Sequence, residues 1–149
     1  MKIRPVRSHD SERINRLLEN AKLPPQDLSV DHVQAVVATI GEHIVGHAAV
    51  EVHGQHGLLR SVVTDPEVQR QGIASALVTH LEKSASDAGL DSLFLLTETA
   101  FDYFSRLGYE ARERDTAPDS IRESSEYSIV CPSSAALMIK QLKKKDGHG

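Results

Sequence analysis

The 149-residue sequence contains one cysteine, no tryptophan and few aromatic residues of any kind. The lone thiol, Cys131, cannot form an internal disulfide, and it provides neither a zinc quartet nor a redox pair. No run of about eighteen apolar residues occurs, which argues against a membrane-spanning helix. The start, Met1–Pro5, has no apolar stretch behind its positive charges, which argues against an export signal. These absences predict a soluble, cytoplasmic protein without a membrane partner.

An excess of basic residues is also missing, because the net charge is −4 at pH 7. Four lysines gather near the end of the chain, and we interpret them as a solvated tail: Lys140, Lys143, Lys144 and Lys145. Binding to a phosphate backbone needs a positive face, so nucleic-acid binding is not expected. The length and the 40% hydrophobic content suffice for one core but not for two. We expect one domain over residues 1–145 and a disordered tail at 146–149.

Hydrophobic periodicity alternates between the strand and the helix pattern along the chain. Asp10 is expected to cap the first helix, and Gly89 to follow the second. Ser133 or Ser134 would cap a last helix running through Lys140. Strands are expected at residues 2–6, 33–40, 43–53, 58–64, 93–96, 109–112 and 126–130, and helices at 10–21, 100–107 and 133–140. One long helix is expected between the Asp65-Pro66 turn and Gly89, with Ile73, Leu77, Leu81 and Ala85 on its apolar stripe.

The three strands between residues 33 and 64 should be antiparallel, with a turn over Gly54–Gly57. If that turn is symmetric, Glu51 lies opposite Arg60, where opposite charges attract. Leu93–Leu96 is apolar on both faces, as in a central strand that helices cover on both sides. The pattern predicts an α/β fold with a mixed, mostly antiparallel central sheet and helices on both faces.

The most informative stretch is Val62–Ser75, in which a strand, an Asp65-Pro66 turn and a small-residue loop lead into a helix. Backbone N–H groups at a helix start are unpaired and suit a pyrophosphate. Gly72 and Ala74 are small enough for phosphate to approach, and Arg70 can add a charge-assisted contact. The stretch is therefore a candidate polyanion site in an acidic protein.

With this motif, Gln69-Arg70-Gln71-Gly72-Ile73-Ala74, and this order of elements, the sequence resembles the GNAT N-acetyltransferase superfamily. The resemblance implies acetyl-CoA as co-substrate, no metal, and a sheet that splays between strands four and five. The backbone of the preceding strand would pair with the pantetheine arm, and the loop would hold the pyrophosphate. The implied cofactor-binding residues are Val62, Val63, Thr64, Gln69, Arg70, Gln71, Gly72, Ile73, Ala74, Ser75, Thr97 and Phe104.

A second family signature has an Asn, then a Tyr that protonates the departing thiolate, then a Gly followed by an aromatic residue. The corresponding positions here hold Thr97, Phe104 and Gly108-Tyr109, so the usual acid is replaced by phenylalanine. Tyr103 would project about 100° away on a helix. Coenzyme A can leave as a thiolate because a thiol pKa is about 8.5. Activity without the tyrosine is therefore expected.

The acceptor side is less constrained by the sequence. An α-amino group of pKa about 8 is neutral in about one molecule in ten at pH 7, so a small amino acid needs little help from a base. Glu51, Glu98 and His53 are candidate bases, and Arg60, oriented by Glu51, is a candidate for binding a substrate carboxylate. A purely structural Glu51–Arg60 ion pair is equally compatible. His53 and His56 lack a third ligand at a recognisable spacing, so no metal is expected.

Three phrases, beginning at Gly57, Leu95 and Val130, resemble the GNAT branch associated with arsenic-resistance operons. That resemblance implies N-acetylation of a toxic glutamate analogue such as arsinothricin or phosphinothricin. Two alternatives stay open, a non-catalytic acetyl-CoA-binding module and an enzyme that acetylates proteins or peptides. Many relatives form homodimers, and the last elements of this chain could do so.

Overall fold

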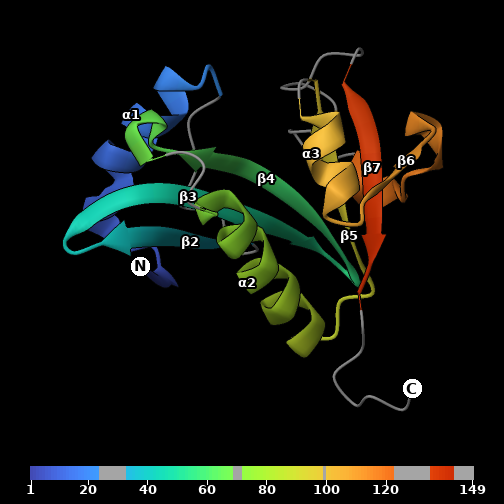
Figure 1. Ribbon diagram of the computed structural model, residues 1–149. Coiled ribbons are helices and arrows are strands. Elements are labelled where there is room, and N and C mark those ends of the chain that lie inside the picture. Colours follow the sequence, from blue (N-terminus) through green and yellow to red (C-terminus); the bar gives the residue numbers. More distant parts are fainter. Residues whose placement is uncertain (24–32, 69–71, 99, 123–134, 143–149) are drawn as a thin grey trace. The chain divides into compact units, whose positions relative to one another are not determined.

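The computed structural model describes residues 1–23, 33–68, 72–98, 100–122 and 135–142 (Figure 1). Its strands form one seven-stranded sheet in the order β1-β2-β3-β4-β5-β7-β6. The chain divides into a first unit, Met1–Glu51 with Ser61–Leu81, and a second unit, Val52–Arg60 with Glu82–Gly149. Only β4 and β5 pair in parallel, joining His56, Gly57 and Leu58 to Ser92, Leu93 and Phe94. The predicted α/β class and mostly antiparallel sheet are confirmed.

The first unit begins with antiparallel strands at the positions that the sequence indicated. They are β1 (Lys2–Pro5), β2 (Val33–Ile40) and β3 (His43–His53). A bulge interrupts the register of β2 and β3, because Ala38 pairs with Gly46 while Thr39 pairs with Ile44. A one-residue shift moves side chains to the opposite face. Both parities of β3 are buried, and the buried residues include His47, whose Nδ1 lies 3.0 Å from the Val36 carbonyl oxygen.

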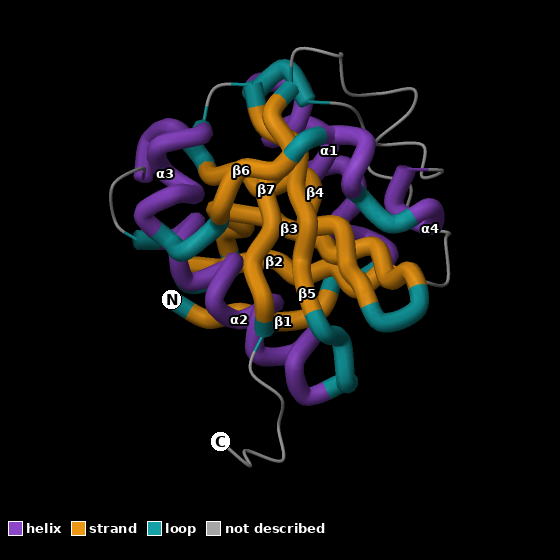
Figure 2. Tube along the Cα trace, turned by 90° about the vertical axis from the view of Figure 1, so that its right-hand side faces the viewer, coloured by secondary structure: helices purple, strands orange, loops and turns teal. Residues whose placement is uncertain are grey.

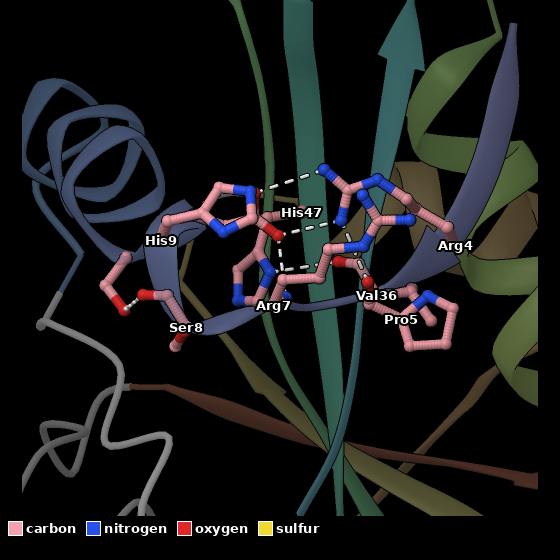
Figure 3. Close-up of polar contacts among 9 residues, drawn as sticks. Arg4, Pro5, Arg7, Ser8, His9, Val36 and His47 are labelled. Carbon is pink, nitrogen blue, oxygen red and sulfur yellow. Dashed lines mark hydrogen bonds and ion pairs between the residues drawn. The ribbon is translucent and has the colours of Figure 1, made fainter. Parts of the chain in front are cut away.

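The first helix starts differently from the prediction. A short 3₁₀ turn, η1 (Ser8–Asp10), precedes α1 (Ser11–Asn20), and the Asp10 side chain makes no capping bond to α1. Asp10 instead accepts the backbone N–H of Arg7 at 2.7 Å and a bidentate pair from Arg4 at 2.8 and 3.1 Å. Figure 3 shows Arg4 reaching from β1 towards this turn. The carboxylate therefore ties β1 to the chain entering α1, because a buried charge requires partners.

The strand β4 (His56–Thr64) begins two residues earlier than predicted, because the turn uses only Gly54 and Gln55. After it come η2 (Pro66–Val68) and α2 (Ile73–Asp87). The predicted apolar stripe of α2 is buried, and Gly89 after its end has a φ of +91°. A left-handed residue at this position ends a helix by satisfying its last carbonyl groups.

In the second unit, β7 (Ala136–Gln141) lies between β5 (Ser92–Thr97) and β6 (Glu110–Arg112) (Figure 2). It pairs antiparallel to both strands. The terminal helix predicted for this segment is therefore wrong. Alanine, leucine and methionine favour a helix in isolation, but hydrogen bonds to two strand edges override this weak preference. The short helix α3 (Phe101–Arg106) is confirmed, with Gly108 behind it at φ +99°.

A compact core in the second unit includes Leu58, Phe94 and Leu137, together with Ala117 and Ile121. Ile121 belongs to α4 (Asp119–Arg122), which follows η3 (Arg114–Thr116) and which the sequence did not indicate. The predicted strand at 126–130, Cys131 and the tail at 146–149 lie outside the described residues. Within the described part of the chain, no helix is long and apolar enough to cross a membrane.

Candidate active site

The turn after β4 is organised by Asp65. Its backbone N–H donates to the carbonyl oxygen of Val45 at 2.8 Å, and its carbonyl oxygen accepts the N–H of Val68 at 3.0 Å. Its Oδ1 also accepts the N–H of Glu67 at 2.9 Å, in the manner of an Asx turn. Asp65 thereby binds the backbone of Val45 on β3 and of Glu67 and Val68, the two residues after Pro66. The direction in which the chain leaves β4 is fixed by these bonds.

Gly72 stands immediately before α2 with a φ of +75°. Apart from Gly72 and its chain neighbours, no atom of the described residues lies within 4 Å of where its Cβ would be. Its carbonyl oxygen accepts the N–H of Ala76 at 3.0 Å, which begins the helix ladder. The first N–H groups of a helix have no partner inside the helix, and the helix dipole makes this end positive. Ile73 is buried, whereas Ala74 and Ser75 are half-buried. The predicted contacts of Gln69, Arg70 and Gln71 lie outside the described residues.

Gly46 on β3 lets the first turn of α2 approach the sheet. A Cβ at this residue would meet Ile73 Cγ2 and Leu77 Cδ1 at 2.9 Å and the Val63 carbonyl oxygen at 3.3 Å. A side chain at this position would therefore require Ile73 and Leu77 to shift. Gly46 was not among the predicted site residues, because a glycine inside a strand has no periodic signal of its own. The one available signal was the glycine itself, since a glycine inside a strand often marks a bulge or a close approach of another segment.

The predicted pantetheine-binding strand segment contains Val62, Val63 and Thr64. Val63 is buried, and its two neighbours are half-buried. Just before them, Ser61 has a φ of +61°, an uncommon conformation for a residue with a side chain. This kink breaks the alternation of β4 beside the segment, and the sequence had no signal for it. The pairing of the segment with pantetheine stays a prediction.

The residues at the second signature form an aromatic cluster. Phe104 is 7% exposed, and its ring meets Tyr103 and Tyr109 edge-on at centroid distances of 5.2 and 5.7 Å. Thr97 Oγ1 accepts the N–H of Ala100 at 3.0 Å and so holds the start of α3. Tyr109 is buried and donates its hydroxyl proton to Glu82. Burial and the Glu82 carboxylate both raise the pKa of Tyr109, so it stays protonated.

The candidate acceptor residues are divided between the two units. Glu51 is buried on β3 in the first unit, whereas His53, Arg60 and Glu98 belong to the second. His53 and Arg60 are half-buried, and Glu98 is exposed after β5. The grouping of these residues at one acceptor site, including the Glu51–Arg60 pair, stays a prediction. In the described part of the chain, no three His, Cys, Asp or Glu residues are grouped as metal ligands.

The sequence profile of the Acetyltransferase (GNAT) family matches residues 5–109. The chain belongs to the GNAT acetyltransferase family. The GNAT match spans β1 to the residue before β6, and therefore includes the Asp65 turn, Gly72 and α2. By its family, the chain is thus an acetyl-CoA-dependent N-acetyltransferase, as the loop motif predicted.

Solved structures with the same fold agree with this GNAT assignment. N-acetylglutamate synthase from Neisseria gonorrhoeae, complexed with coenzyme A and N-acetyl-glutamate, superposes with a TM-score of 0.82 and 19% identity, over 96% of this chain. This chain spans only 35% of that protein. Rv2747 from Mycobacterium tuberculosis, in complex with CoA, has a TM-score of 0.80 and 24% identity, covering 96% of this chain and all, 100%, of the other.

The ribosomal-protein-S18-alanine N-acetyltransferase from Escherichia coli also shares the GNAT fold. Its TM-score is 0.75 at 17% identity, and the match covers 99% of this chain and 97% of that chain. The three neighbours act on or are bound to different molecules, according to their names. At these identities the likeness concerns the fold of this GNAT protein and leaves its acceptor open.

Proposed function

We propose that this enzyme moves the acetyl group of acetyl-CoA to the amine of a small amino-acid-like molecule. A toxic glutamate analogue, such as arsinothricin or phosphinothricin, is the finer form of the proposal. The observation that carries it is the open, positively polarised start of α2 at Gly72, directly after the turn that Asp65 organises. This arrangement fits the diphosphate of a coenzyme.

The co-substrate would be held by two parts of the first unit. The pyrophosphate would bind at residues 69–75, where Gly72 leaves room for it. The pantetheine arm would run along Val62–Thr64 and use their backbone groups as an added strand would. Thr97 and Phe104 would contact the coenzyme near its thioester. The apolar side chains of Val62 and Val63 make no such bonds, and the strand supplies its backbone N–H and C=O groups instead.

The reaction is a direct transfer between two bound substrates. The lone pair of the neutral amine attacks the acetyl carbonyl carbon, the new C–N bond forms, and the C–S bond breaks. The extra proton on nitrogen passes to a base, for which Glu51, Glu98 and His53 are the candidates, directly or through water. Arg60 would bind the substrate carboxylate, since its planar fork matches one.

The departing thiolate needs little protonation by the protein. A thiol pKa of about 8.5 makes the thiolate a tolerable leaving group near neutral pH. Phe104 has no proton to give, and the hydroxyl proton of Tyr109 is already donated to Glu82. Both observations support release of coenzyme A without a tyrosine acid at these two positions.

The preference for an amino acid acceptor has chemical support and one structural parallel. An α-amine is neutral far more often than a lysine side chain at pH 7, so it demands less of a base. The synthase that shares this fold is bound to N-acetyl-glutamate, although this chain spans about a third, 35%, of it. Both facts favour a small acceptor with an α-amine.

The deciding experiment is release of coenzyme A thiol from acetyl-CoA by the purified protein. Glutamate, phosphinothricin, arsinothricin and a lysine peptide are offered as acceptors, with acetyl-CoA alone as the blank. We expect turnover on a glutamate-like amino acid and none on the peptide. Turnover on the peptide alone would replace the proposal by protein acetylation.

A non-catalytic acetyl-CoA-binding module is the second candidate function. It is favoured by one observation, the buried phenylalanine at the position of the usual acid, Phe104. Binding of CoA in calorimetry without turnover on any amine would establish this alternative. Turnover on any single acceptor above the blank would remove it.

A further inference from the structure

A guanidinium group on α1 reaches the turn that follows β4. Arg13 Nη2 donates to Asp65 Oδ2 at 2.8 Å, and Arg13 Nε donates to the carbonyl oxygen of Ile44 at 3.2 Å. The side chains are 35% and 19% exposed, so the pair is shielded from water more than a surface ion pair. All three residues belong to the first unit. Arg13 thus links α1, β3 and the end of β4.

The two oxygens of Asp65 have different partners. Oδ2 accepts from Arg13, whereas Oδ1 accepts the backbone N–H of Glu67 within η2. A carboxylate held at one oxygen has its rotation about χ2 restricted, and its other oxygen is then aimed in one direction. Arg13 therefore sets the orientation of the group that shapes Pro66–Val68. This turn is the last described segment before Gln69.

The fold itself does not depend on this ion pair. The apolar side of α1 is anchored by Ile14, Leu17 and Leu18, which are at most 1% exposed and pack with Val37, Ile44 and Val63. Burial of three such side chains contributes several kcal/mol, at about 1.5–3 kcal/mol for each. Loss of Arg13 should therefore leave α1 in place. The loss of Arg13 would instead leave the Asp65 carboxylate free to rotate, because Oδ2 loses its donor.

We propose that Arg13 is a positioning residue for coenzyme A, acting through Asp65. It orients the turn Pro66–Val68, so that the backbone at the end of β4 is arranged for the coenzyme before it binds. The proposal rests on the proposed function, since it assumes that the coenzyme binds at Val62–Thr64 and at the start of α2. Nothing in the sequence pattern joins residue 13 to residue 65.

The test compares coenzyme A binding and steady-state kinetics for Arg13→Ala and Asp65→Asn. For Arg13→Ala we expect the Kd of coenzyme A and the KM of acetyl-CoA to rise about tenfold, the loss expected for one charge-assisted interaction. The kcat and the KM of the acceptor should change less than about twofold, because neither group touches the acceptor. Asp65→Asn should act in the same direction.

Two matched controls separate positioning from a general loss of stability. Arg16→Ala removes another arginine from α1, whose partner Glu12 is 3.3 Å away on the exposed surface, and should leave Kd unchanged. Asp10→Asn weakens the same unit at the start of α1 through loss of the Arg4 ion pair, which does not involve Asp65, and should lower the melting temperature without raising Kd. Arg13→Lys keeps the charge but loses the planar fork, and should bind coenzyme A between wild type and Arg13→Ala.

The outcomes distinguish this proposal from the proposed function. If wild type binds coenzyme A and Arg13→Ala and Arg13→Lys bind it equally well, the positioning role is overturned while the proposed function stands. If wild type does not bind coenzyme A at all, the proposed function fails and the positioning role with it. An equal rise in Kd for Asp10→Asn and Arg13→Ala would also overturn the positioning role.

Discussion

The hydroxyl of Tyr109 donates a hydrogen bond to Glu82 Oε2 at 2.9 Å, across from Lys140, whose Nζ donates to Glu82 Oε1 at 3.0 Å. Lys140 also donates to the carbonyl oxygen of Leu107 at 2.8 Å and lies 5.6 Å from the centre of the Tyr109 ring. One carboxylate therefore joins α2, β7 and the segment after α3. In this network the hydroxyl of Tyr109 stabilises the fold, because its proton is donated to Glu82.

Removal of the Tyr109 hydroxyl should lower stability and change its pH dependence. Tyr109→Phe should lower the free energy of unfolding by about 1.5–3 kcal/mol at pH 7, the value of a hydrogen bond to a charged group. Because the folded-state pKa of Tyr109 is raised, its contribution is complete below the unfolded pKa of about 10 and falls as pH rises above it. The gap between wild type and variant should shrink by about 1.4 kcal/mol per pH unit there. Urea unfolding between pH 7 and 11 measures this, and a constant gap would contradict it.

Asp10 should confer stability that is lost in acid. The bonds from Arg4 hold the pKa of Asp10 below its usual range, and the N–H of Arg7 adds to the effect. A lowered folded-state pKa means that the stabilisation is present above the unfolded pKa of about 3.9 and disappears as pH falls through the folded value. Asp10→Asn should lose about 1–3 kcal/mol at pH 7. Thermal melts of both proteins should draw together as pH falls from about 4 through the lowered folded-state pKa, and a gap that stays constant over this range would refute the assignment.

A side chain at Gly46 should disturb the start of α2. Gly46→Ala should cost about 1–3 kcal/mol, as overpacking does, because Ile73 Cγ2 would be 2.9 Å from the new methyl group. The clash should be relieved when that atom is absent. In a double-mutant cycle, Gly46→Ala should therefore be less harmful in an Ile73→Ala background. Additive losses in denaturant unfolding would show that the two residues do not meet.

Negative charge at Gly72 should block the coenzyme and leave the fold intact. Gly72→Glu should weaken coenzyme A binding by more than about 100-fold, because a like charge facing the diphosphate costs several kcal/mol. Gly89→Glu is the matched control, since Gly89 follows the same helix with a φ of +91° and open space around it. Both variants bear similar backbone strain, so a difference between them in the Kd of coenzyme A, measured by calorimetry, reports on the coenzyme site and not on folding. Equal affinities would refute the loop assignment.

A tyrosine at position 104 should help catalysis only slightly. General acids usually contribute factors of about 10² to 10⁴, but a thiolate is already a stable leaving group. Phe104→Tyr should therefore raise kcat by less than about tenfold. Tyr103→Phe is its companion, because Tyr103 is the half-buried tyrosine beside Phe104. A loss of about 100-fold or more in kcat for Tyr103→Phe would identify Tyr103 as the general acid, although the family signature places that acid at position 104.

Local patterns were sufficient for much of the sheet, and they also indicated the loop that we propose as the coenzyme site. The bounds of β2 and β3 and the stripe of α2 follow from hydrophobic periodicity, and Gly89 and Gly108 follow from the need for positive φ at helix ends. The loop motif could be identified because each of its residues has a use that needs no distant partner. Such features are decided within a few residues of chain.

Tertiary structure decided the remaining features, because their causes lie far apart in the sequence. Residues 136–141 form a strand since β5 and β6 offer their edges, although their composition favours a helix. Asp10 binds Arg4 instead of capping α1, and His47 is buried on β3 beside the carbonyl oxygen of Val36. Arg13 meets Asp65 across 52 residues, and Gly46 matters only because α2 packs on it. Periodicity records which face of an element is apolar, whereas contacts between elements depend on the packing of the whole chain.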